Sequence, residues 1–247
     1  MPEQSRPFLT ASWRNLVMLT FTVDPAAIID RVPPGTTLDS WHGKTFVSLV
    51  GFQFLDTKVL GAPVPFHQDF EEVNLRFYVR RVTEDGARPA VVFISEIVPR
   101  PVVGSMARLL YREPYIVVPM RSKVAPGQPP EAEYQWQMKG RWYALAARGE
   151  GPSAPAPAPG AEAAPGSLEE FLTERHWGYN GEPGKDTLEY RVDHPRWRLW
   201  HARDVRFEVD ADALCGAELA RQLKAPVSAL VADGSPVTIH WRTRIAD

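Results

Sequence analysis

The chain of 247 residues carries 28 basic and 30 acidic side chains, and its net charge of −2 gives no basic surface of the kind that binds nucleic acids. Its residues are 44% hydrophobic and 11% aromatic, enough for a large core, but no apolar run reaches the roughly 18 to 20 residues that a membrane helix needs. Cys215 is the only cysteine, which excludes an internal disulfide and, with an N-terminus unlike a signal peptide, predicts a cytoplasmic protein.

The first half of the chain is dense in strand signals. β-branched and aromatic residues gather in segments that are bounded by Gly, Pro, Asp or Asn, which is typical of β-strands. These segments are residues 15–23, 44–60, 71–82, 90–98 and 114–124. Asp85-Gly86 suits a tight turn, so we expect 71–82 and 90–98 to pair as an antiparallel hairpin.

Four segments predict helices. Asp24 and Pro25 are a favourable N-cap and first turn for a short helix, and Ser167 and Glu170 form a capping box. The expected helices are 24–32, 101–113, 166–179 and 210–226. Cys215 lies in the last of these, within an apolar pattern that predicts an inert core thiol. Further strands are expected in 142–149, 186–209 and 235–245.

Residues 150–166, EGPSAPAPAPGAEAAPG, have a different composition. They contain Pro, Ala and Gly with no bulky apolar side chain, so they bury too little surface to offset the entropy of ordering. Because strands are predicted on both sides, we expect a flexible loop inserted in one domain.

The strand at 71–82 has two faces of opposite character. Val73, Leu75, Phe77 and Val79 form an ordinary buried face by alternation. The other face carries a row of polar side chains: Glu72, Asn74, Arg76, Tyr78 and Arg80. This second face either meets solvent, as one side of an antiparallel sheet often does, or lines a polar cavity.

Several motifs along the chain resemble the YqjF-like family, which is grouped with the acetoacetate decarboxylase-like superfamily. They include FLTASWRNLVMLTFTVDP, PVPFHQDFEEVNLRFYVRR, EIVPRPVVGSMARLLYREPY and HPRWRLW. The resemblance implies a single domain over residues 1–247, mostly β, in which antiparallel strands form a closed cone-like barrel with a few peripheral helices. It also favours the cavity over solvent for the second face, because a barrel of this kind encloses space for a small ligand.

The resemblance gives Glu72 the role of the decarboxylase glutamate, since Phe70-Glu71-Glu72-Val73 is similar to the motif around it. The decarboxylases also use a lysine that forms a Schiff base, and the corresponding place here, Arg112-Glu113-Pro114-Tyr115, has none. Lys123, two residues after Arg121, is the one lysine near another cation, and charges solvated at the rim are the commoner explanation of this pair. Schiff-base decarboxylation is therefore not expected.

Other residues are candidates for ligand binding. Arg112 and Tyr115 lie at the junction that the resemblance aligns with the reacting end of the cavity, although an arginine at a helix C-terminus is also favoured by the helix dipole. His67 is a candidate acid or base, although a histidine in such a loop is more often simply exposed. The histidine spacing predicts no metal site, and no cofactor motif is present.

These observations predict a small-molecule-binding protein whose ligand is a carboxylate or carbonyl compound. Glu72 would be the catalytic acid or base, and the ligand would be held by Asn74, Arg76, Arg112, Tyr115, Tyr78 and His67. Lyase-type chemistry on an oxo acid is one interpretation, and a non-catalytic binding or interaction protein on the same fold is the other. Neither nucleic acid nor a membrane is an expected partner, and the sequence leaves homo-oligomer formation open.

Overall fold

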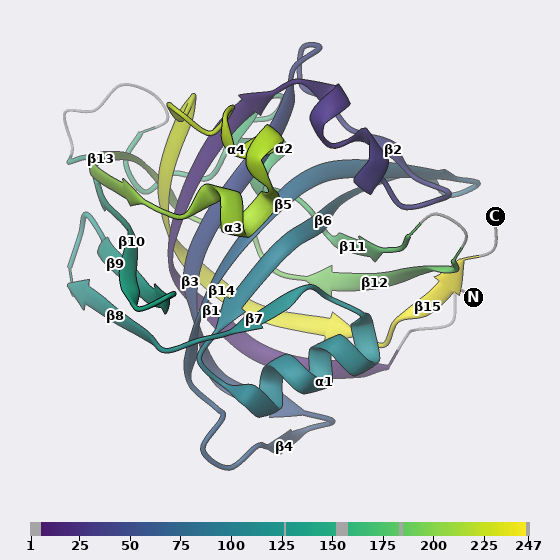
Figure 1. Ribbon diagram of the computed structural model, residues 1–247, viewed down its shortest axis with the longest axis horizontal. Helices are drawn as coiled ribbons and strands as arrows, with labels where there is room; N and C mark the ends of the chain where they lie inside the picture. Colours follow the sequence, from purple (N-terminus) through teal and green to yellow (C-terminus); the bar gives the residue numbers. More distant parts are fainter. Residues whose placement is uncertain (1–5, 126, 152–157, 183–184, 246–247) are drawn as a thin grey trace.

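The computed structural model describes residues 6–125, 127–151, 158–182 and 185–245, without the side chains of 106–108, and strands dominate it (Figure 1). The helical elements are η1 (Pro25–Ala27), η2 (Ile29–Arg31), α1 (Pro101–Tyr111), α2 (Leu168–Thr173), α3 (Ala211–Cys215) and α4 (Ala217–Ala220). The strands are β1 (Pro7–Val23), β2 (Thr37–Leu38), β3 (Thr45–Val59), β4 (Ala62–Pro63), β5 (Phe70–Thr83), β6 (Gly86–Val98), β7 (Tyr115–Val117), β8 (Met120–Ala125), β9 (Glu131–Met138), β10 (Arg141–Gly149), β11 (Trp177–Asn180), β12 (Thr187–Asp193), β13 (Leu199–Glu208), β14 (Ser228–His240) and β15 (Thr243–Ile245).

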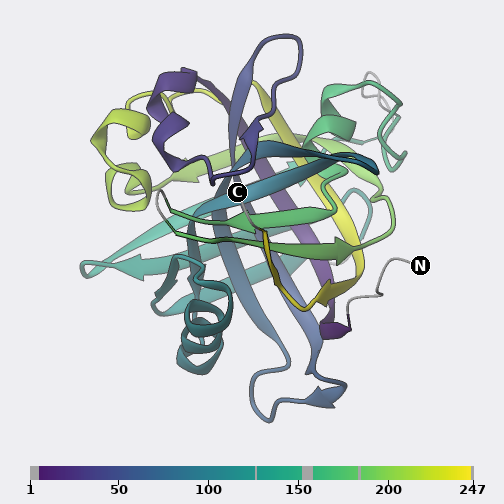
Figure 2. The same cartoon turned by 90° about the vertical axis from the view of Figure 1, so that its right-hand side faces the viewer.

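The strands join in a strongly curved sheet. Its order is β15-β12-β11-β6-β5-β3-β1-β14-β13-β10-β9-β8, and neighbours are mostly antiparallel. The predicted hairpin is confirmed, because β5 and β6 pair from Val73–Ile97 to Thr83–Gly86. A second pairing, Val192 with Ile239, joins β12 to β14, which are six places apart in this order. The sheet therefore curves back on itself, as Figures 1 and 2 show.

Some predicted helices differ from the observed ones. The segment 24–32 forms two short 3-10 turns, with Asp24 accepting a hydrogen bond from the amide of Ala26. The segment 210–226 breaks into α3 and α4 because Gly216 adopts a φ of 84° between them. The capping box at Ser167 starts α2 as expected, but the helix ends at Thr173 and residues 177–180 become β11.

The Pro/Ala-rich segment is attached to the sheet at its C-terminal part. Residues 152–157 lie outside the described residues, so the expected flexibility applies to a part that the structure does not describe. Farther along, Ala161 and Leu199 form an isolated β-bridge, and Ala163 is buried. A Cβ placed on Gly160 would lie 3.0 Å from the ring of Trp200. This close approach explains why small residues occur here.

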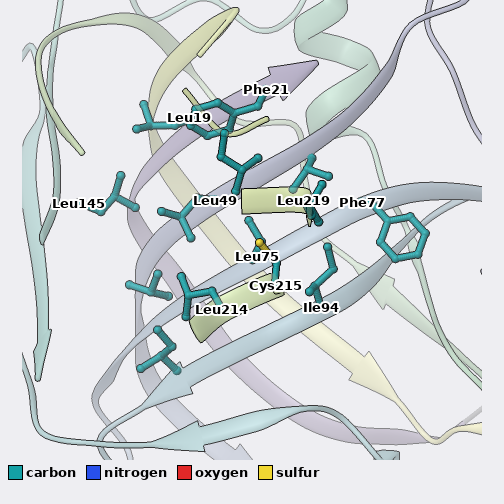
Figure 3. Packing of buried hydrophobic residues seen from close by; sticks show 14 of the residues in the cluster. Leu19, Phe21, Leu49, Leu75, Phe77, Ile94, Leu145, Leu214, Cys215 and Leu219 are labelled. Atoms are coloured by element: carbon teal, nitrogen blue, oxygen red, sulfur yellow. The ribbon is translucent and has the colours of Figure 1, made fainter. Parts of the chain in front are cut away.

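Both faces of β5 are buried. The face with Val73, Leu75 and Phe77 belongs to a core that α3 and α4 cover (Figure 3). Figure 3 shows Leu214, Cys215 and Leu219 pointing from these helices at the sheet, and burial raises the pKa of the Cys215 thiol to about 11. This setting fits the expectation of an unreactive core cysteine. The opposite face of β5 borders a second apolar cluster and the cavity described below.

No helix in the described part of the chain has the length and hydropathy needed to cross a membrane.

Candidate functional site

The concave face of the sheet encloses a cavity of about 150 Å³. A single water needs about 10–15 Å³ by the same measure, so the space suits an organic molecule of on the order of ten non-hydrogen atoms. Side chains from β1, β3, β5, β6, β12 and β14 line it, together with α1 and the segment around α2. Val102 of α1 lines the cavity and is 47% exposed, which places an opening beside this helix.

The row predicted on β5 divides into two groups. Glu72, Asn74 and Arg76 line the cavity and are buried, with 2%, 3% and 8% of their surface exposed. Tyr78 is fully buried but lies outside the lining, where its hydroxyl contacts Ser48 at 2.6 Å. Arg80 is exposed. The first three residues of the polar face therefore line the cavity. Tyr78 is packed in the protein interior outside the cavity, and Arg80 faces solvent.

Glu96 joins this wall because of a β-bulge. Leu75 pairs with Ser95 and Arg76 pairs with Phe93, so β6 has an extra residue at Ile94. The bulge reverses the alternation, which puts both Phe93 and Glu96 on the cavity side despite their odd spacing. Asn74 and Glu96 are then cross-strand neighbours.

The junction between α1 and β7 orients its residues differently from the prediction. Arg112 has a φ of 57°, and its side chain is exposed and contacts the carbonyl oxygen of Asp186 at 3.4 Å, outside the cavity lining. Its neighbours Tyr111 and Glu113 point inward, as does Tyr115. The left-handed backbone at Arg112 thus turns the chain so that Glu113, and not the arginine, enters the cavity.

Hydrogen bonds hold two of the carboxyl groups in place. Asn74 Nδ2 donates to Glu72 Oε1 at 3.0 Å, and the hydroxyl of Tyr115 donates to Glu72 Oε2 at 3.1 Å. Glu113 accepts from the hydroxyl of Tyr190 at 2.8 Å and from Asn180 Nδ2 at 2.9 Å. The partners of Glu72 lie on β5 itself and on β7, and those of Glu113 lie on β11 and β12, so the sheet sets the position of each group.

Burial makes these carboxyl groups weak acids. It raises the pKa of Glu72 to about 7, although the hydrogen bonds from Asn74 and Tyr115 and the charge of Arg76 favour the carboxylate. Burial likewise raises the pKa of Glu113 to about 8, against the hydrogen bonds from Tyr190 and Asn180. Glu72 therefore titrates near neutral pH, where a general acid or base is most effective.

The pKa of Glu96 is raised as well. Burial and then the charges of Glu113 and Glu72 raise its pKa well above the usual range, and a hydrogen bond with Tyr115 acts in the opposite direction. Its Oε2 has no hydrogen-bond partner among the described residues. A neutral carboxyl group with a free oxygen can donate a hydrogen bond into the cavity.

Arg76 supplies a positive charge to the same space. Its Nη2 donates to the carbonyl oxygen of Leu172 at 3.2 Å, its Nε is buried without a partner, and no described carboxylate forms an ion pair with it. The nearby Arg175 is different, because it pairs with Asp39 at 2.5 Å. A buried cation without a counter-ion is costly, so Arg76 is suited to an anionic ligand.

Two histidines also border the cavity. His67 lines its edge from the loop before β5, half-buried, with Nδ1 at 2.8 Å from the carbonyl oxygen of Pro65. His194 was not a predicted site residue; it stacks on Trp197 at 4.8 Å, and burial lowers its pKa. Within the described residues no group of three or more His, Cys, Asp or Glu is placed to hold a metal ion.

No lysine reaches the cavity. All six lysines of the chain are described and exposed, including Lys123, and none belongs to the lining. Tyr115, at the place where the resemblance would put the amine, donates its hydrogen bond to Glu72 instead. The cavity lining thus includes acids, an amide and the guanidinium groups of Arg76 and Arg175, but no amine that could form a Schiff base.

The sequence of the chain matches the model of DUF2071, an uncharacterized conserved protein family, over residues 10–236. The chain belongs to the DUF2071 family. The uncharacterized protein YqjF of Bacillus subtilis (strain 168) is 27% identical over 113 residues, which are 45% of this chain and 45% of that protein. The chain thus matches less than half the length of this curated relative. These matches confirm the predicted YqjF-like membership.

Solved structures of the acetoacetate decarboxylase type share the fold. An acetoacetate decarboxylase-like enzyme from Sphingomonas wittichii RW1 superimposes with a TM-score of 0.64 at 12% identity, covering 98% of this chain and 94% of its own. The enduracididine biosynthesis enzyme MppR complexed with pyruvate and the acetoacetate decarboxylase of Legionella pneumophila each give 0.64 at 13% identity, covering 100% of this chain and 93% of their own. At such identities the likeness establishes the fold, mostly β and acetoacetate decarboxylase-like.

Proposed function

We propose that this protein binds a small oxo acid in the cavity and transfers a proton at the carbon next to its carbonyl group, with Glu72 as the general acid or base. This proton transfer would form the enolate from which a lyase-type reaction starts, and it would proceed without a Schiff base. The closed cone-like barrel and the single domain over residues 1–247, both implied by the resemblance, belong to this proposal.

The observation that carries the proposal is the presence of Arg76 and Glu72 in one buried wall. Arg76 has a guanidinium charge without a carboxylate partner among the described residues, and Glu72 lies four residues away on the same strand, about 13 Å along β5. Asn74 and Glu96 lie between them. From Arg76 toward the start of β5, this wall therefore offers a cation that can pair with a carboxylate, then a hydrogen-bond donor for a carbonyl oxygen at Asn74 and Glu96. The acid or base, Glu72, comes last.

The order of groups suits the chemistry of an enolate. When the ligand carboxylate pairs with Arg76, its carbonyl oxygen comes to the level of Asn74 and Glu96. Glu72 as carboxylate then takes a proton from the adjacent carbon. The electron pair of the broken C–H bond forms a C=C bond, and the π pair of the C=O bond moves onto the carbonyl oxygen. The neutral Glu96 carboxyl donates a hydrogen bond to that developing oxyanion. Protonated Glu72 returns the proton to carbon in the reverse step.

The fold neighbours lend support by analogy. MppR has been solved with pyruvate and also with the condensation product of pyruvate and imidazole 4-carboxaldehyde. We expect a ligand of the same class, a carboxylate with a neighbouring carbonyl group, to fit between Arg76 and Glu72. Fold analogy alone is a weak warrant for function, so the proposal depends on the cavity residues.

A second function, non-catalytic binding, is favoured by the absence of lysine from the cavity lining. A binding protein needs Arg76 and the apolar walls but not an acid that titrates near pH 7. The two functions therefore differ in what Glu72 does once a ligand is bound.

Deuterium exchange separates them. Pyruvate is incubated with the protein in D₂O, and loss of its methyl proton signal is followed by NMR, with binding measured in parallel by calorimetry. We expect binding together with exchange faster than the buffer rate. Binding without exchange would support the non-catalytic function, and the absence of both would contradict the proposal. Borohydride treatment with pyruvate should give no mass gain, because all six lysines are outside the cavity.

A further inference from the structure

The cavity has a polar wall and an apolar wall on adjacent strands. Glu72, Asn74, Arg76 and Glu96 come from β5 and β6, whereas β1 and β3 contribute the apolar side chains Trp13, Leu16, Val50, Phe52 and Phe54. The strand order β6-β5-β3-β1 makes these two walls continuous. A ligand that fills the space therefore has to be amphipathic, with its polar groups on one edge.

The apolar wall consists largely of aromatic rings in mutual contact. Trp13 meets Phe52 edge-on with ring centroids 5.4 Å apart, and it meets Phe54 at 6.0 Å with an interplanar angle of 88°. On its other side Trp13 lies 6.4 Å from Trp197. Rings packed edge to face expose both a face and an edge to the cavity. A further aromatic ring can pack favourably against either.

One atom of this wall lacks a partner. The Nε1 of Trp13 is buried and has no hydrogen bond to any described residue. A buried indole N–H normally finds an acceptor, and either an oxygen atom or the π face of a ring can serve. A purely aliphatic ligand side chain would leave this donor unsatisfied.

The register of the sheet gives the spacing between the two walls. Phe52 pairs with Glu72, and Val50 pairs with Asn74. Moving from Arg76 toward the start of β5, a ligand therefore meets first Asn74 and Glu96 and then Glu72 opposite Phe52. A carboxylate at Arg76 and a carbonyl at Asn74 leave the carbon chain pointing at the rings.

We propose that the preferred ligand is a monoanionic aryl oxo acid, whose carboxylate pairs with Arg76 and whose aromatic ring packs against Trp13 and Phe52. The inference rests on the proposed function and specifies its substrate class. The guanidinium of Arg76, which has no carboxylate partner among the described residues, matches one carboxylate, and the ring wall matches a planar side chain one carbon beyond the carbonyl group.

The test compares phenylpyruvate, cyclohexylpyruvate and pyruvate by titration calorimetry on the full chain. Burial of a phenyl ring should make phenylpyruvate bind about 30-fold more tightly than pyruvate. The cyclohexyl compound has a similar size but no π face, so it should bind about 5-fold more weakly than phenylpyruvate. Phe52→Leu should weaken phenylpyruvate about 10-fold and leave pyruvate within about 2-fold.

Phe77→Leu provides the matched control. Phe77 is equally buried and lies on β5, but it faces the core on the opposite side of the sheet, so its substitution should not change the preference. Equal binding of the cyclohexyl and phenyl compounds, or pyruvate binding as tightly as phenylpyruvate, would overturn the aryl preference while the proposed function stood. If none of the three acids binds, both the proposed function and this inference are wrong.

Discussion

The hydroxyl of Tyr115 donates a hydrogen bond to Oε2 of Glu72 at 3.1 Å, across strands that are not neighbours in the sheet. Glu96 lies on the strand between them and is paired with both Asn74 and Tyr115. The carboxyl groups of Glu72 and Glu96 thus share one tyrosine. The contact holds Glu72 in position, and the buried surroundings keep its pKa near 7.

Replacement of Glu72 by glutamine should remove proton transfer while ligand binding survives. The amide side chain keeps the volume of the original and can still hydrogen-bond with Asn74, but it cannot accept a proton from carbon. We expect the exchange rate of the bound acid to fall at least ~100-fold. In the wild type the rate should rise as pH increases through about 7, because the carboxylate form of Glu72 is the base.

Glu71→Gln is the matched control for this measurement. Glu71 is the preceding residue on β5 and does not line the cavity, and its side chain accepts a hydrogen bond from Ser122 at 2.8 Å. Its substitution should leave the exchange rate and its pH midpoint unchanged. Full exchange activity in the Glu72→Gln variant would show that another group is the base.

Replacement of Arg76 by methionine should abolish binding of acids without loss of stability. The guanidinium is buried and forms no ion pair with a described residue, so an apolar side chain of similar length removes a costly charge. Affinity for pyruvate should fall at least ~50-fold, since hydrogen bonds to charged groups contribute most to such recognition. Calorimetry measures the affinity, and thermal unfolding should give an equal or higher midpoint.

Arg112→Met tests the other arginine that the sequence singled out. Its side chain is exposed and outside the cavity lining, so the variant should bind pyruvate like the wild type. If Arg112→Met weakened binding as much as Arg76→Met, the ligand would have to extend out of the cavity to the exposed side chain of Arg112.

The sequence predicts the residues of the polar wall only where polar and apolar residues alternate regularly along a strand. Glu72, Asn74 and Arg76 follow a strict period of two, and the structure places all three in the cavity lining. Glu96 does not follow it, because the bulge at Ile94 changes the phase of β6. A bulge depends on pairing with a distant segment, and alternation within 90–98 carries no signal for it.

At the junction after α1 the structure places Tyr115 in the cavity lining and Arg112 outside it, for a related reason. The motif located the right four residues, but which of them points inward depends on the φ of 57° at Arg112. A positive φ at a residue other than glycine is uncommon, and here the carbonyl of Arg112 is held by Asn180 at 2.8 Å, 68 positions along the chain. Tertiary contacts therefore determine that the side chain of Glu113, and not that of Arg112, points into the cavity.

Tyr78→Phe should lower stability but leave the cavity intact. The Tyr78 hydroxyl is the end of a buried chain in which Ser48 contacts it at 2.6 Å and Thr20 contacts Ser48 at 2.7 Å. Loss of one such hydrogen bond should lower the free energy of unfolding by about 1 kcal/mol. Affinity for pyruvate, measured on the same samples, should stay within about 2-fold of the wild type. A large loss of affinity would indicate that Tyr78 contributes to ligand binding, as the sequence predicted.

Glu96→Gln should flatten the dependence of stability on pH. The folded-state pKa values of Glu72, Glu96 and Glu113 lie above the ordinary value of 4.5, so the folded protein binds more protons than the unfolded chain above that pH. The stabilisation is complete below about pH 4.5 and is lost as the pH rises through 7 to 8, and Glu72 alone accounts for about 3 kcal/mol of it. The amide introduced at position 96 has no acidic proton to lose, so the contribution of this group to the pH dependence is removed. Urea unfolding at pH 5, 7 and 9 should therefore show wild-type stability falling with pH and a smaller fall in the variant. Parallel pH profiles for the two proteins would contradict a buried, protonated Glu96.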